Sequence, residues 1–205
     1  MSRSSTTLLR FLQEENARLQ EENKQLREEL AALRDYLDGL RLLQQEARRM
    51  TEEADLMPLL DKILYAALTV TDAADGSVLL LDPETDELVF AVVHGLIREQ
   101  LVGYRIPKET GIAGWVVTHG SPLIVNRPHL DRRFSRQVDE QFGFKTRSLL
   151  CVPMMGSEGK IVGAIEVLNK FSGREFTQAD QDLLMVMGYI AGSALEMVLN
   201  KFEAQ

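Results

Sequence analysis

The chain has 205 residues, of which 45% are hydrophobic and 26% are charged. This length suits one globular domain of roughly 150 residues with an appended segment, and no second core is expected. The formal net charge is -8 at pH 7. Nucleic acids and anionic membrane surfaces are bound by basic faces, so the charge predicts no nucleic-acid partner and no membrane partner.

The compartment is indicated by cysteine usage and by the apolar runs. Cys151 is the single cysteine and has no partner for an intrachain disulfide. No apolar stretch of the sequence approaches the roughly 18 residues that a membrane span requires. The opening MSRSSTTLLRFLQEE lacks the apolar core of a signal peptide. We therefore expect a protein of the reducing cytoplasm.

A heptad repeat dominates the N-terminal segment. Leucines recur every seven residues, at Leu12, Leu19, Leu26, Leu33 and Leu40. Asn16 and Asn23 fall at the interleaved core positions, where paired asparagines favour a parallel dimer. Glu22 would face Arg27 of the partner helix in the same register. The pattern predicts a parallel coiled-coil homodimer over residues 1–42, followed by a globular domain over 43–205; the alternative is a lone charged surface helix.

The first part of the globular domain reads as a helix, a hairpin and a group of short elements. Periodicity and turn residues define the expected segments. In chain order they are a helix over 55–70, strands over 76–81 and 87–94, a short helix over 111–119, an edge strand over 122–126 and a polar loop with helical turns over 131–142.

A second hairpin and a closing helix complete the domain. The strands at Leu149–Val152 and Ile161–Leu168 are apolar on both faces, so they are expected inside the sheet. Thr177 and Asp180 form a reciprocal cap at the start of the last helix, which carries two apolar stripes. The chain therefore predicts an α+β domain whose antiparallel sheet has the terminal helices on one face and short helices over a pocket on the other.

Several motifs in this order resemble a GAF domain. They are GIAGWV at 111–116, FKTRSLLCVPM at 144–154, GAIEVLNK at 163–170 and the FTQAD opening of the last helix. Asn169, Lys170, Phe176 and Asp180 resemble a signature of GAF domains in cyclic-nucleotide phosphodiesterases and cyclases, with Gln181 in place of its final acid. The resemblance implies a GAF-like fold closed by a Lys170–Asp180 salt bridge.

The same resemblance implies a cyclic nucleotide as a possible ligand. The residue types of the phosphodiesterase pocket are matched at five positions, Ser77, Ile112, Asp139, Thr146 and Glu166. They are not matched at Val93, His94 and Phe142, which removes the ring that packs on the purine.

Four further residues, Phe134, Phe142, His94 and Ala113, complete the candidate ligand site. Phe134 or Phe142 could supply a ring in place of the missing one, and His94 takes the place of a pocket aspartate. The backbone N–H groups near Ile112 and Ala113 could hold a cyclic phosphate at the helix start. The competing interpretations are a solvent-facing carboxylate for Glu166 and plain core packing for Ile112.

Catalytic and metal chemistry find little support in the residue pattern. His94, His119 and His129 lack a second ligand at metal-binding spacing, although one histidine can still ligate haem. No nucleophile, base and orienting group occur together, so we expect no enzyme. The expected function is a dimeric cytoplasmic small-molecule sensor that signals through its coiled coil or an unknown signalling partner. The alternative is a ligand-free dimerisation scaffold.

Overall fold

The computed structural model describes residues 15–16, 18–20, 23, 56–156 and 159–203. The chain divides into two units, Met1–Leu42 and Leu43–Gln205. The described residues of the first unit are helical, and Arg18 pairs there with Glu15 at 2.7 Å. The rest of the predicted coiled coil lies outside the described residues, so the parallel dimer stays a prediction.

The second unit is built on one antiparallel sheet in the order β3-β2-β1-β6-β5-β4. Its strands are β1 (Ala73–Asp82), β2 (Glu87–His94), β3 (Arg105–Pro107), β4 (Leu123–Val125), β5 (Leu149–Met155) and β6 (Ile161–Lys170). β5 and β6 each have a neighbour on both sides, as predicted for strands that are apolar on both faces. β4 is the expected edge strand.

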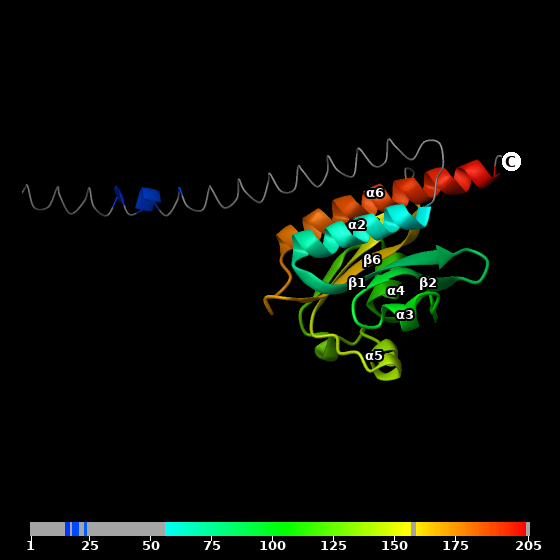
Figure 1. The fold of residues 1–205 in the computed structure, drawn as a ribbon, viewed down its shortest axis with the longest axis horizontal. Coiled ribbons are helices and arrows are strands. Elements are labelled where there is room, and N and C mark those ends of the chain that lie inside the picture. Colours follow the sequence, from blue (N-terminus) through cyan, green and yellow to red (C-terminus); the bar gives the residue numbers. More distant parts are fainter. Residues whose placement is uncertain (1–14, 17, 21–22, 24–55, 157–158, 204–205) are drawn as a thin grey trace, which may run out of the picture. The chain divides into compact units, whose positions relative to one another are not determined.

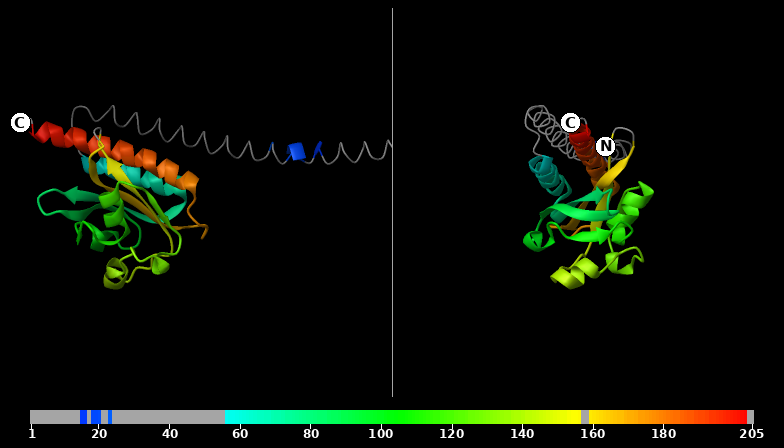
Figure 2. Two further views of the ribbon diagram at one scale, coloured as in Figure 1. Left: turned by 180° about the vertical axis from the view of Figure 1, so that it is seen from behind. Right: turned by 90° about the vertical axis from the view of Figure 1, so that its right-hand side faces the viewer.

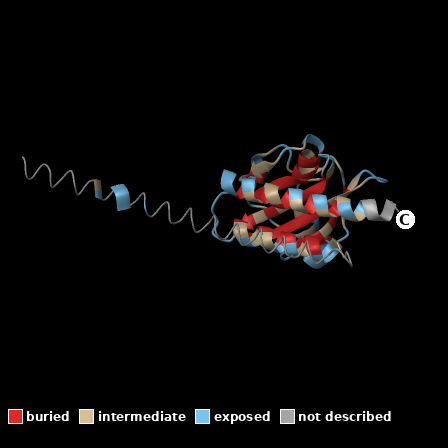
Figure 3. Ribbon diagram, turned by 90° about the horizontal axis from the view of Figure 1, so that it is seen from above, coloured by how far each residue is buried: buried red, intermediate tan, exposed pale blue. Residues whose placement is uncertain are grey.

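Two long helices cover one face of the sheet (Figures 1 and 2). They are α2 (Leu56–Thr71) and α6 (Gln178–Glu203), which contact each other as well as the strands. Figure 3, seen from this side, shows mostly buried strands beneath helices whose outward residues are more exposed. Leu60, Ile63, Ile165 and Leu184 are fully buried in this layer. The α+β arrangement with its terminal helices on one face is therefore confirmed.

Two glycines let α6 lie directly against β5. A Cβ atom built on Gly188 would lie 2.6 Å from the carbonyl oxygen of Pro153. One built on Gly192 would collide with the carbonyl of Met155. The helix begins with the predicted cap, because Thr177 N–H donates to Asp180 Oδ2 at 2.7 Å and Asp180 N–H donates to Thr177 Oγ1 at 3.3 Å.

One expectation about apolar length needs correction. Among the described helices, the Gln178–Leu199 part of α6 is long and apolar enough to cross a membrane by length and composition, with a mean hydropathy of 1.5. The cause is the pair of apolar stripes, which together leave few charges on this helix. Core helices of globular domains meet the same criterion, and α6 packs on β5 and β6.

Short elements cover the opposite face of the sheet (Figure 1). They are α3 (Arg98–Leu101), α4 (Gly111–His119), the 3-10 turn η1 (Pro128–Leu130) and α5 (Gln137–Phe142). A second core cluster joins α4 to the strands, with Val116, Leu79 and Ala164 fully buried. The sheet thus separates the long helices from a layer of short segments, and the candidate site lies in that layer.

Candidate functional site

A cavity of about 80 Å³ lies between the sheet and the short segments that contain α4 and α5. Its walls are largely apolar and include Phe90, Val93, Phe134, Phe144, Leu149 and Leu168. The polar side chains converge from several elements, namely Asp75, Ser77, His94, Asp139, Thr146 and Glu166. A concave apolar space with a few converging polar groups is typical of a small-molecule site.

Ser77 and Glu166 form a hydrogen-bonded pair on the sheet side of the cavity. They lie opposite each other in the β1–β6 ladder, so their side chains leave the sheet on the same face. Ser77 Oγ donates to Glu166 Oε1 at 2.7 Å. Burial raises the pKa of the Glu166 carboxyl, the charge of Asp139 raises it further, and the Ser77 bond opposes both effects. The described residues provide no other hydrogen bond to Glu166, so Oε2 is free to accept a hydrogen bond from a ligand.

The N-terminus of α4 presents free backbone donors to the same cavity. Gly111 has a φ of +70°, which favours glycine, and Thr110 makes no side-chain cap. The first helical bond runs from Gly114 N–H to Thr110 O at 3.1 Å. Within the described part of the chain, the N–H groups of Ile112 and Ala113 therefore have no hydrogen-bond acceptor. Such groups attract an anion.

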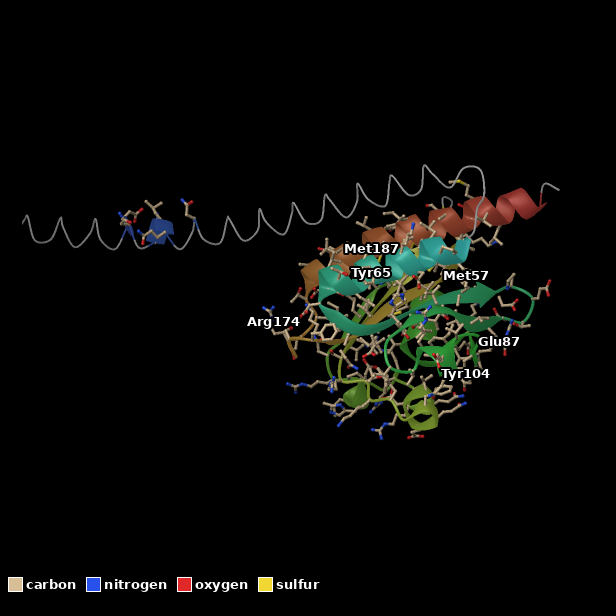
Figure 4. The ribbon with its side chains drawn as sticks, viewed as in Figure 1. Met57, Tyr65, Glu87, Tyr104, Arg174 and Met187 are labelled. Carbon is tan, nitrogen blue, oxygen red and sulfur yellow. The ribbon has the colours of Figure 1, made fainter. Side chains whose placement is uncertain are left out.

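α5 covers the cavity and is fastened at two places. Asp139 accepts from both Thr146 N–H at 2.9 Å and Thr146 Oγ1 at 2.7 Å. Tyr104, labelled in Figure 4, donates to Gln141 Oε1 at 2.7 Å and accepts from Gln137 Nε2 at 3.0 Å. These contacts hold α5 as a short lid over the cavity.

Asp75 and Asn169 organise the end of the cavity near β1 and β6. Asp75 accepts from Leu96 N–H and from Asn169 Nδ2, both at 3.4 Å. Asn169 has a φ of +56°, and its side chain also accepts from Arg147 N–H at 2.8 Å and donates to the Lys145 carbonyl at 3.2 Å. Asn169 therefore fixes the loop that presents Thr146.

His94 connects the cavity to the helical layer. It ends β2, lines the cavity and contacts Asp61 Oδ1 of α2 through Nε2 at 2.9 Å. The ring of Tyr65, also on α2, lies 6.2 Å from the imidazole. A ligand that moves His94 would therefore act on α2 directly.

The structure brings together all of the candidate ligand residues except Phe142. Those that line the cavity are Ser77, His94, Ile112, Ala113, Phe134, Asp139, Thr146 and Glu166. Phe142 instead packs edge-on against Tyr104, with ring centroids 5.2 Å apart. Sequence reasoning missed Asp75 and Phe144; Phe144 opens the FKTRSLLCVPM motif, whereas nothing local to Asp75 indicates its role.

Lys170 and Asp180 lie outside this cavity. Their ion pair measures 2.8 Å, and the two side chains are 11% and 10% exposed. Asp180 also accepts from Thr177 Oγ1 at 2.9 Å, and Lys170 lies 5.4 Å from the ring of Phe176. The pair joins the end of β6 to the start of α6, so its place is structural.

Neither a metal site nor a reactive thiol is evident in the part of the chain that the structure describes. That part contains no group of three or more His, Cys, Asp or Glu residues arranged to hold a metal ion. Cys151 is buried in β5, and burial raises its pKa well above the ordinary value, assisted by the charge of Glu166. A thiol in such a place is a poor nucleophile.

A central antiparallel sheet with two long helices on one face and a cavity beneath short segments on the other defines a class of α+β domain. The GAF domain family model matches residues 55–195, so the chain belongs to the GAF domain family. The matched region is a regulatory domain and carries no catalytic assignment.

Similar proteins are found among phosphodiesterases. The chain is 32% identical over 155 residues to a dual 3',5'-cyclic-AMP and -GMP phosphodiesterase 11A of Takifugu rubripes, a match that covers 71% of this chain and 17% of that protein. It is 29% identical over 153 residues to a dual phosphodiesterase 11 of Drosophila melanogaster, covering 68% of this chain and 10% of that protein. The chain thus spans less than a fifth of the length of these relatives.

Solved structures show the same fold. The GAF domain of a phosphoenolpyruvate-protein phosphotransferase from Coxiella burnetii matches with a TM-score of 0.69 at 16% identity. That match covers 82% of this chain and 98% of the other.

Proposed function

We propose that this protein is a homodimeric regulatory module that binds a small molecule in its cavity and passes the bound state to a signalling partner. The observation that carries the proposal is the convergence of free or exchangeable polar groups from β1, β6 and α4 on one apolar, lidded space. A pocket of this construction suits recognition rather than structural support.

A cyclic nucleotide is the ligand class that the relatives favour. The free N–H groups of Ile112 and Ala113 suit a cyclic phosphate, and Ser77 and Glu166 suit a base or ribose edge. Val93 replaces the expected aromatic ring, but Phe134 and Phe144 also line the cavity and offer stacking faces.

The route of the signal is proposed to run through the helices. His94 links the cavity to Asp61 on α2, and α2 packs against α6. Large apolar side chains are exposed on both helices, including Tyr65 at 64% and Met197 at 60%. We propose that these helices continue the dimer begun by the coiled coil over 1–42, in a cytoplasmic protein that binds neither nucleic acid nor membrane.

A ligand-free scaffold is the second candidate function. The cavity of about 80 Å³ is small beside the roughly 300 to 1000 Å³ of ordinary ligand pockets. A nucleotide would therefore need more room, either by outward movement of α5 or by extension into the neighbouring hollow that shares Phe134, Asp139, Phe144 and Thr146 with the cavity. If the cavity takes no ligand, the domain serves dimerisation alone.

Calorimetry on ligand-stripped full chain with cyclic AMP, cyclic GMP and cyclic dinucleotides tests the proposal. Thr146→Ala removes both a cavity hydroxyl and the side-chain bond that holds Asp139, so binding should weaken by about 1 to 3 kcal/mol. Thr118→Ala is the matched control, because Thr118 is exposed on α4 away from the cavity. If none of these nucleotides binds below millimolar concentration, a cyclic nucleotide is not the ligand, and the ligand-free scaffold becomes the stronger candidate.

A further inference from the structure

The charged side chains that line the cavity are acidic. They are Asp75, Asp139 and Glu166, and the lining contains neither lysine nor arginine. His94 is the one basic side chain there, and it already contacts Asp61. The lining therefore favours a ligand that brings positive charge or N–H donors of its own.

Glu166 is the carboxylate with unused capacity. Both oxygens of Asp139 accept from Thr146, and both oxygens of Asp75 accept from Leu96 and Asn169. Glu166 Oε1 accepts from Ser77, while Oε2 receives no hydrogen bond from the described residues. A cationic group placed at Oε2 would gain a charge-assisted hydrogen bond and would also be attracted by Asp139.

The N-terminus of α4 favours a negatively charged group, in contrast to Glu166. The N–H groups of Ile112 and Ala113 have no acceptor among the described residues, and they lie at the positive end of the helix dipole. They favour a carboxylate or another anion. The cavity thus has an acceptor end and a donor end, separated by apolar walls.

We propose that the ligand is a small zwitterion of amino-acid size, with its ammonium group at Glu166 and its carboxylate at the start of α4. This inference rests on the proposed sensor function and replaces the ligand class of the relatives with one derived from this cavity. A cyclic nucleotide satisfies the α4 end, but it offers Glu166 only the neutral N–H donors of its base, which form weaker hydrogen bonds to a carboxylate than an ammonium group does.

A metal ion at the acidic residues fits the structure less well. The carboxylates of Asp75, Asp139 and Glu166 line one cavity, yet the described residues form no group of three that could hold a metal. Each oxygen of Asp75 and of Asp139 already accepts one hydrogen bond from the protein. An organic ammonium needs only the one free acceptor at Glu166, since its other hydrogen bonds can be made to water or to Ser77.

Calorimetry with matched probes tests the two ends separately. The ligand-stripped full chain is titrated with L-alanine, L-leucine and L-methionine. It is then titrated with isoamylamine, which lacks the carboxylate of leucine, and with 4-methylpentanoate, which lacks its ammonium group. At least one amino acid should bind, and each half-ligand should bind at least tenfold more weakly, because it forfeits one charge-assisted interaction.

Glu166→Gln keeps the shape of the side chain and removes its charge, so the affinity for the amino acid should fall at least tenfold. Glu140→Gln is the control, since Glu140 is an exposed acid on α5 outside the cavity lining and its loss changes the net charge equally. Glu166→Asp keeps the charge but moves the carboxylate back by one methylene, so the loss of affinity for the amino acid should be intermediate. It also serves if the glutamine variant does not fold.

The outcomes separate this inference from the proposed function. Binding of a cyclic nucleotide without binding of any amino acid would overturn the zwitterion and leave the sensor standing. Half-ligands that bind as tightly as the amino acid would overturn the placement of its two charged groups. An affinity for the amino acid that Glu166→Gln leaves unchanged would overturn it as well. If none of the three amino acids binds at millimolar concentration, the zwitterion is wrong; the sensor function is wrong only if the cyclic nucleotides also fail to bind and the natively purified protein carries no small molecule.

Discussion

Glu166 shows how much of the site depends on one residue and its neighbours. Burial and the charge of Asp139 raise its pKa, so the folded protein keeps the proton at pH values where the unfolded chain has lost it. Stability should therefore fall as pH rises from about 4.3 through the raised pKa. The titratable side chains that line the cavity with this carboxyl are Asp75, Asp139 and His94, and Cys151 lies opposite Glu166 in the β5–β6 ladder.

Glu166→Gln should remove this pH dependence. Its free energy of unfolding, measured by urea denaturation between roughly pH 4 and pH 8, should rise relative to the unsubstituted protein as pH increases through that window. The advantage of glutamine should then level off above the raised pKa. If the curves of unfolding free energy against pH stay parallel for the variant and the unsubstituted protein, the pKa of Glu166 is not raised by folding. Glu140→Gln is the control and should give such parallel curves.

At the residue scale, the sequence predicts several residues of the cavity but not the hydrogen bonds that they make. Ser77, Thr146 and Glu166 were identified by resemblance, yet the Ser77–Glu166 bond depends on strand register across 89 positions. Asp75 was missed because its role depends on Asn169, which lies 94 positions away in a left-handed conformation. Local patterns carry no information about such contacts.

At the scale of elements, the packing of α6 on β5 rests on the glycines at 188 and 192. Replacement of a helical glycine by alanine ordinarily stabilises by up to about 1 kcal/mol. Here the added methyl groups would collide with the Pro153 and Met155 carbonyls, so Gly188→Ala and Gly192→Ala should each destabilise the domain by about 1 to 3 kcal/mol. Ser193→Ala, on the exposed side of the same helix, is the control and should be nearly neutral. Chemical denaturation measures all three, and a stabilising effect at either glycine would contradict the observed approach of α6.

Elements with a clear period were predicted well, and short ones were not. The helix at Gly111–His119 has the predicted bounds, and both hairpins were found, because turn residues and apolar patterns mark them. α3 and β3 have four and three residues and were not predicted, since neither is long enough to establish a period. Both help to close the cavity through Leu101 and Ile106, so its enclosure could not be anticipated from the sequence.

At the scale of the whole molecule, the heptads predict how two copies associate. Asn16→Leu combined with Asn23→Leu should raise the thermal stability of the assembly and broaden its distribution of oligomers, because buried asparagine pairs favour one register at a cost in stability. Light scattering at micromolar concentration should give a dimer for the unsubstituted chain and a mixture of species for the variant. A monomer for the unsubstituted chain would contradict the proposed dimer.

The claim that the cavity binds a small molecule is tested most directly by native mass spectrometry of the full chain purified without denaturation. The unsubstituted protein should carry one small molecule per protomer. Val138→Trp should lack it, because Val138 lines the cavity from α5 and is only half-buried, so a larger ring there fills the space while folding is retained. The same adduct on both proteins, or no adduct on the unsubstituted protein even after incubation with the amino acids and cyclic nucleotides above, would contradict ligand binding in this cavity.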